Sequence, residues 1–146
     1  MRRLTRFFRL PATRRRLFIQ AARWLVVVRL GLWVLPFRKL QPLVARLRGV
    51  PRGPVDAAVM REVAWAVQAA SRYVPAATCL TQALTGQILL QRRGYPAQVE
   101  IGVAKDESGQ FMAHAWLRCD GVVLIGGSAA SLRRYTPLHT MNGAKQ

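Results

Sequence analysis

The sequence predicts an α+β domain in which helices come first and a small antiparallel sheet follows. As far as Gly94, apolar residues recur at steps of three and four, the spacing of helices that bury one side. Beyond Gly94 the period changes to two, the spacing of strands. The chain has 146 residues and 51% of them are hydrophobic, so a single domain with a real core is expected.

The first fifty residues are predicted to form a basic amphipathic helical region, residues 1–50. A helix is expected over residues 14–35, and Pro36 ends it. A short helix is expected over residues 40–48, and "GVPRGP" then marks a linker to the core unit, residues 51–146. The apolar stripe of the long helix is Leu17, Ala21, Trp24, Leu25, Val28, Leu32 and Leu35.

Two more helices are predicted in the first half of the core unit. One starts at Asp56, a residue type that caps helix N-termini, and ends before Pro75. The other starts near Thr78 and runs to Arg92 or Arg93, with Gly94 as its C-terminal cap. Their buried sides are predicted to be Val59, Val63, Ala66, Val67 and Ala70, and Leu80, Ala83, Leu84, Ile88 and Leu89.

Three strands are predicted after the helices, over residues 97–104, 111–118 and 122–126. The loop "KDESGQ" joins the first two, and a tight turn at Asp120 and Gly121 joins the last two. Consecutive short connections of this kind indicate an antiparallel meander. His139 follows Pro137 in the polar tail and is expected to be a solvated loop residue.

Charge is distributed unevenly along the chain. The 23 Lys and Arg residues against six Asp and Glu residues give a formal net charge of +17, which implies an acidic partner or an anionic surface. Most of the arginines lie in the first fifty residues. This region is interpreted as a solvated basic face, a docking surface for a protein or acidic peptide, or a helix on anionic lipid with Trp24 and Trp33 at the interface. Nucleic-acid binding is not expected, because no recognised module accompanies the arginines.

The chain is expected to act in the cytoplasm, at the membrane surface if the basic helix meets lipid. Two cysteines cannot make the disulfide framework of a small secreted protein, and neither lies in a zinc-type pair, so no metal or cofactor is expected. The segment "TRRRLFIQ" lacks a following cleavage site, which speaks against export. A membrane span is not expected in the basic region, because its longest uncharged run, residues 30–37, is far short of about 20 residues.

Cys79 is the first candidate for chemistry. In the first turn of a helix, its sulfur would lie near unpaired backbone N–H groups and the positive end of the helix dipole, which stabilise a thiolate. The same N–H groups can bind an oxyanion after attack on a carbonyl. The alternative is a buried cysteine that fills the core, and this structural role is the expectation for Cys119.

His114 is the candidate partner of that thiol. On the second strand, Met112, His114 and Trp116 point to one face of the sheet and Ala113 and Ala115 to the other. If the Cys79 helix packs on the His114 face, thiol and imidazole can meet as nucleophile and base. The alternative is a half-buried histidine whose ring is satisfied by a backbone carbonyl.

The stretch from "CLTQALTGQILLQRRG" through "FMAHAWLRC" to "YTPL" resembles the family of lasso-peptide maturation proteases in its split B2 form. The resemblance implies a papain- and transglutaminase-like core, a helix packed on a small antiparallel sheet, in which Cys79 is the nucleophile and His114 the general base. It implies a cysteine peptidase that removes the leader from a ribosomally made precursor peptide and needs no cofactor. The implied partners are that precursor, a separate leader-recognition protein and the lasso cyclase.

The third catalytic residue is where the chain departs from the family, whose members often carry an Asp on the strand after the histidine strand. Gly126 and Gly127 stand in that region. Asp120 is the nearest downstream carboxylate, but as a turn residue it would lie about 20 Å along the strand from His114. Glu100 is expected to face away, and Asp106 and Glu107 to lie in a distant loop. A backbone carbonyl near Gly126, or Ser128, is the other candidate for orienting the ring.

Two further functions are compatible with the same residues. The missing acid favours a non-catalytic basic adaptor, in which a transglutaminase-like scaffold binds peptide or a membrane surface. Amide transfer would use the same thioester chemistry but resolve it with an amine in place of water.

Overall fold

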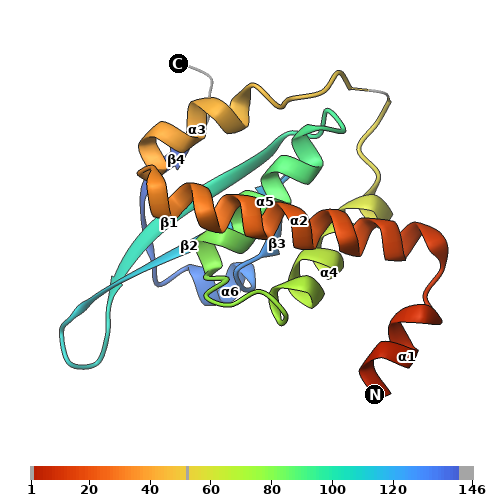
Figure 1. Ribbon diagram of the computed structural model, residues 1–146. Helices are drawn as coiled ribbons and strands as arrows, with labels where there is room; N and C mark the ends of the chain where they lie inside the picture. The colour runs from red at the N-terminus through yellow and green to blue at the C-terminus, as the bar shows by residue number, and fades with distance from the viewer. Residues whose placement is uncertain (1, 52, 142–146) are drawn as a thin grey trace.

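The computed structural model describes residues 2–51 and 53–141 (Figure 1). Within these residues, six helices and four strands follow one another in the order expected of an α+β chain, with the sheet built after most of the helices. They are α1 (Arg2–Phe8), α2 (Ala12–Val34), α3 (Phe37–Ala45), α4 (Ala57–Ser71), α5 (Cys79–Gln91), β1 (Ala97–Lys105), β2 (Phe111–Cys119), β3 (Val122–Ile125), α6 (Ala129–Leu132) and β4 (Thr136–Met141).

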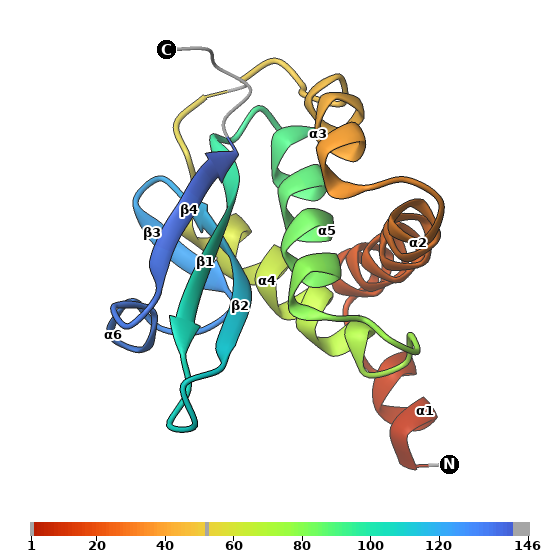
Figure 2. The same cartoon turned by 90° about the vertical axis from the view of Figure 1, so that its left-hand side faces the viewer.

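The elements form layers that are plain in Figure 2, with the sheet on one side, α4 and α5 behind it and α2 outermost. Helix α5 contacts α2, α4 and the three strands β1, β2 and β3. The small helix α6 lies on the other side of the sheet (Figure 2). This arrangement confirms the predicted α+β class with a helix packed on a small antiparallel sheet.

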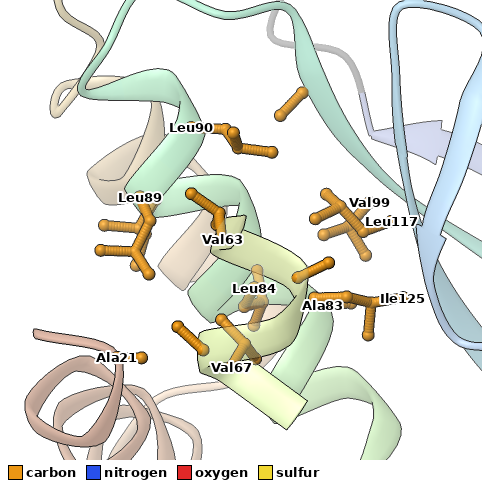
Figure 3. Close-up of a cluster of buried hydrophobic side chains, with 14 of the residues drawn as sticks. Ala21, Val63, Val67, Ala83, Leu84, Leu89, Leu90, Val99, Leu117 and Ile125 are labelled. Atoms are coloured by element: carbon orange, nitrogen blue, oxygen red, sulfur yellow. The ribbon is translucent and has the colours of Figure 1, made fainter. Parts of the chain in front are cut away.

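Helix α5 is the centre of the core, where Thr81 and every residue from Ala83 to Gln91 are buried. A helix that is apolar on nearly all sides is stable only when other elements surround it, and α5 is surrounded by α2, α4 and the sheet. Two of its buried polar side chains are hydrogen-bonded to backbone, since the Thr85 hydroxyl donates to the Thr81 carbonyl at 2.8 Å and Nε2 of Gln91 donates to the Ala97 carbonyl at 3.2 Å. Figure 3 shows the packed side chains: Ala21, Val63, Val67, Ala83, Leu84, Leu89, Leu90, Val99, Leu117 and Ile125.

The sheet contains the predicted meander and one strand more. Its order is β3-β2-β1-β4, all antiparallel where they pair. Asp120 and Gly121 form the tight turn between β2 and β3, both with positive φ, 50° and 77°. The expectation that His139 lies in a tail loop was wrong, because this residue belongs to β4 and its backbone pairs with Ile101 of β1. A short edge strand that contains a proline carries little strand signal in the sequence.

The helices in the first fifty residues differ from the prediction. Helix α1 was not expected, α2 begins two residues earlier, and α3 spans Phe37–Ala45 in place of residues 40–48. The reason for the earlier start is that Pro36 is extended (φ −66°, ψ 154°) and serves as the N-cap of α3, so it ends one helix and begins another. The Asp56 cap of α4 is confirmed, since its carboxylate accepts from the Ala58 N–H at 2.8 Å.

Helix α2 packs on the core through its inner side, where Ala21, Leu25 and Val28 are buried against α4 and α5. Within the described residues it is also long and apolar enough, by length and composition, to cross a membrane. This finding concerns length and composition alone, and the expectation that the chain has no membrane span stays a prediction. The predicted division of the chain at residue 50 stays a prediction.

Candidate active site

Cys79 is the first residue of α5 and is half-buried at the edge of the core. Thr78 caps the helix, and its hydroxyl accepts from the Thr81 N–H at 3.3 Å. The preceding turn holds Ala76 at a φ of 58°, with the Thr78 N–H donating to the Ala76 carbonyl at 2.9 Å. Such a φ costs roughly 1–2 kcal/mol in a residue with a side chain. The chain therefore enters α5 through a strained turn directly before the cysteine.

The backbone N–H groups of Cys79 and Leu80 have no hydrogen-bond acceptor in the described part of the chain. The next N–H, that of Thr81, is taken by the cap, and the Gln82 N–H donates to the Thr78 carbonyl. Free donors beside a thiol at a helix N-terminus can stabilise both a thiolate and an oxyanion formed at the same place. The structure thus places the Cys79 thiol beside two backbone N–H groups that are free to donate.

His114 lies on β2, and its ring is fixed by one hydrogen bond and two aromatic neighbours. Its Nε2 lies 2.5 Å from the carbonyl oxygen of Gly126. Because a carbonyl can only accept, Nε2 must carry the proton, and Nδ1 of the neutral ring is left as a base. The rings of Trp116 and Tyr135 lie 6.4 and 5.4 Å from the imidazole, centre to centre. Tyr135 was not predicted to take part, although it opens the segment "YTPL".

The carbonyl of Gly126 therefore orients the imidazole, which is one of the two alternatives left open by the sequence. Asp120 does not, because it is an exposed residue of the β2–β3 turn with a φ of 50°, six residues along the strand from His114. Ser128 is not the orienter either, since its hydroxyl caps α6 by accepting from the Ser131 N–H. The assignment of Asp120 as third catalytic residue is corrected on this geometry.

A side chain at position 126 would not fit. Gly126 has a φ of 101°, and an added Cβ would lie 2.7 Å from both the Ala115 carbonyl oxygen and Cβ of Trp116. Real Cβ atoms do not come that close to backbone, so the orienting carbonyl depends on glycine here. An aspartate in this backbone position is excluded for the same reason.

The expectation that Glu100 faces away from His114 was wrong. Glu100 pairs with Trp116 across β1 and β2, and directly opposite residues share a face, so its carboxylate lies on the His114 side. It accepts from Nε1 of Trp116 and from Nε of Arg118, the latter at 3.1 Å. Glu100 thus fixes the indole beside His114. Asp106 lies in the β1–β2 loop as expected, where hydrogen bonds from Ser108 hold the pKa of its carboxyl below the usual value.

The helix packs on the other face of the sheet from the one that was expected. A Cβ added to Gly86 of α5 would touch side-chain carbons of Leu117 and Ile125, so α5 lies on the face of Leu117, visible in Figure 3. His114 is three residues from Leu117 on a regular strand and points to the opposite face. No hydrogen bond joins Cys79 to His114, and both residues are among those described.

Helix α5 and strand β2 run in the same direction (Figure 2), so the two residues are expected at a similar height along β2. From Gly86 back to Cys79 is seven helical residues, about 10 Å. From Leu117 back to His114 is three strand residues, also about 10 Å. Beyond Leu117 toward Phe111, β2 has no partner on its β3 side, and Ala113 on the α5 face is exposed. Cys79 and His114 therefore lie on opposite faces of β2, next to the part of this strand that does not pair with β3.

Cys119 has the structural role that was expected of it. Its side chain is 0% exposed in the core. Burial, with a smaller contribution from the charge of Asp120, raises the pKa of the Cys119 thiol to about 11. The folded protein therefore keeps this thiol protonated and unreactive until the pH approaches that value.

Alkylation with iodoacetamide over a pH series should separate the two cysteines. We expect Cys79, which is half-buried at the start of α5, to be labelled in the folded protein, and Cys119, which is fully buried, to stay unlabelled. Peptide mapping by mass spectrometry identifies the modified residue, and the unfolded protein, in which both thiols are accessible, is the control. Slow and equal labelling of both residues in the folded protein would contradict the nucleophile assignment.

A cavity between three helices lies away from Cys79 and His114. It measures about 640 Å³ between α1, α2 and α4, and it is lined mainly by apolar and aromatic side chains with Arg6 and Arg72. Tyr73 of its wall opens the segment that leads from α4 to Cys79. Across residues 2–51 and 53–141 there is no cluster of three or more His, Cys, Asp or Glu residues that would hold a metal ion.

Comparison with known proteins gives one match. A family model described as "Transglutaminase-like superfamily" matches residues 22–140, from the middle of α2 to the end of β4. A search of the curated proteins found no match, and neither did a search of the solved structures. The match spans the core layers and both candidate residues.

Proposed function

The chain belongs to the transglutaminase-like superfamily, which commonly contains cysteine-peptidase-type enzymes, and on this premise we propose that it is a cysteine peptidase with Cys79 as nucleophile. Its proposed reaction is removal of the leader from a lasso precursor peptide in the cytoplasm. The observation that carries the proposal is the position of Cys79, half-buried at the start of α5 beside two unpaired N–H groups.

The proposed chemistry has two stages. The Cys79 thiolate attacks the scissile carbonyl carbon, and its proton has passed to Nδ1 of His114. The oxyanion accepts from the N–H groups of Cys79 and Leu80. When the C–N bond breaks, the imidazole gives its proton to the leaving amine, and the leader remains as a thioester. Water, deprotonated by the imidazole, then hydrolyses the thioester and restores the thiol.

This chemistry requires thiol and imidazole to meet, which they do not do in the structure. The end of the β1–β2 hairpin offers the means, because it projects beyond the rest of the sheet (Figure 1) and β2 is unpaired there on one side. A twist of β2 around Ala113 would bring His114 over the open edge toward Cys79. We infer that the bound precursor stabilises this arrangement, so that the free protein is inactive.

The proposed partners follow from the same resemblance. A separate recognition protein would bind the leader and deliver the scissile bond, and the released core would pass to the lasso cyclase. Cys79 and His114 line neither the cavity between α1, α2 and α4 nor the one beside Arg92 and Tyr95. A partner that delivers the scissile bond would supply the specificity that such an open site lacks.

One observation favours a second candidate function, a non-catalytic adaptor on a transglutaminase-like scaffold. Cys79 and His114 point to opposite sides of β2, and Trp116, Tyr135 and Gly126 hold the imidazole in place. In an adaptor these contacts would be purely structural.

Reconstitution separates the two functions. The purified chain is mixed with the precursor peptide encoded beside it and with the recognition protein, and products are identified by mass. We expect cleavage between leader and core, with one water added, and little cleavage without the recognition protein. A product that carries an amine would indicate amide transfer. Binding of the precursor without any change in its mass would favour the adaptor.

A further inference from the structure

The outer face of α2 carries a patch of exposed apolar side chains. Residues on this face recur at steps of three and four, opposite the buried Ala21, Leu25 and Val28. In the second half of the helix all of them are large hydrophobic residues. This α2 patch consists of Val26, Val27, Leu30, Trp33 and Val34, with exposed fractions from 45% to 77%.

Basic residues flank the α2 patch at both ends. Arg16 and Arg23 lie on the same face toward the start of α2 and are exposed, and Arg38 and Lys39 follow directly in α3 and are exposed too. None of these four residues makes an ion pair within the described residues. No acidic residue precedes Asp56 anywhere in the sequence, so no counter-charge within the N-terminal region balances them.

We propose that the α2 patch docks the protein on an anionic lipid surface, with α2 lying in the plane of the membrane. The patch would enter the boundary between headgroups and acyl chains, and the flanking arginines and lysine would bind lipid phosphates. Trp33, 77% exposed, is the residue type that favours this boundary. Trp24 does not contribute, because it packs inward beneath the guanidinium of Arg92, 5.6 Å from its ring.

A lipid surface fits these observations better than a protein partner or a second copy. A second copy would bring the same positive charges against these, since both copies lack acidic residues before Asp56. A bilayer offers apolar depth and dense negative charge along the whole length of α2 at once. A helix that crossed the bilayer would instead have to give up the packing of Ala21, Leu25 and Val28 on the core.

Vesicle flotation tests the proposal with the whole chain. We expect binding to vesicles in which roughly a third of the lipid is phosphatidylglycerol, at least about tenfold weaker binding to phosphatidylcholine alone, and release at high salt. The double variant Val27→Glu/Leu30→Glu changes two residues that are each 54% exposed, and its partitioning is expected to fall by at least about tenfold. The matched control is Phe111→Glu/Val122→Glu, with the same charge change at exposed apolar residues of β2 and β3, and it should bind as the unchanged protein does.

Circular dichroism of both double variants establishes that they are folded. Equal binding of the two variants would overturn the proposal, as would absence of binding to anionic vesicles. A dimer in solution that only Val27→Glu/Leu30→Glu dissociates would assign the α2 patch to a second copy. Loss of the complex with the recognition protein in that variant, without any vesicle binding by the unchanged chain, would assign it to that protein. Resistance to both salt and alkaline carbonate would indicate a spanning helix instead.

Discussion

Replacement of Cys79 by alanine is expected to lower the rate of leader cleavage by at least about a thousandfold, because no other group in the site can form the thioester. The residue is half-buried at the end of a helix, and alanine is a good helix former, so the fold should be kept. The measurement is the initial rate of cleavage in the reconstituted mixture, followed by mass spectrometry.

The matched control is Cys119→Ala, which removes the other thiol. Cys119 is fully buried, so this change should reduce stability but leave the cleavage rate of the folded fraction within a few-fold of the original. His114→Ala should lower the rate by roughly 10²–10⁴, the usual contribution of a general base. Full activity in Cys79→Ala, or in His114→Ala, would contradict the assignment.

Gly126→Ala is expected to lower the free energy of unfolding by about 2–4 kcal/mol, which corresponds to a melting temperature lower by about 5 °C or more. The added methyl group meets the Ala115 carbonyl oxygen and the Trp116 side chain at 2.7 Å, and the φ of 101° is unfavourable for any residue with a Cβ. The Gly126 carbonyl must then move away from His114, so the hydrogen bond that orients the ring in the free protein is lost as well.

Gly121→Ala is the control for the backbone contribution alone. Gly121 also has a positive φ, 77°, but a Cβ there meets nothing within 4 Å. We expect a loss of only about 1 kcal/mol and unchanged cleavage. Thermal unfolding of the two variants gives the comparison, and equal effects of both would contradict the close contact at Gly126.

The helix–sheet order and the position of Cys79 were predictable from the sequence because both depend on local signals. The change of period after Gly94, the threonine cap and the Asp120 and Gly121 turn each act over a few residues. Alternation also established that His114 and Trp116 share a face. Which face of β2 meets α5 depends on how all the layers pack. The face with the apolar Ala115 and Leu117 packs on α5, whereas the prediction placed the His114 face there.

The surroundings of His114 show the same limit. Glu100 and Trp116 come together because β1 and β2 pair in one register, and Tyr135 reaches the ring only after α6 has reversed the chain. No local pattern in the sequence specifies either contact. The Gly126 carbonyl could be foreseen as an alternative. Where no carboxylate is present to accept a hydrogen bond from the ring of His114, a backbone carbonyl has to accept it.

The central claim is that the thiol of residue 79 and the side chain at position 114 meet in the working complex. Disulfide trapping tests this most directly, because a disulfide requires Cα atoms within about 7 Å of each other. In a Cys119→Ser background, His114→Cys is compared with Met112→Cys, which lies two residues away on the same face. With precursor and recognition protein bound, we expect mild oxidation to link positions 79 and 114 and to leave position 112 largely free. Absence of the 79–114 bond in the folded, bound complex would contradict the account.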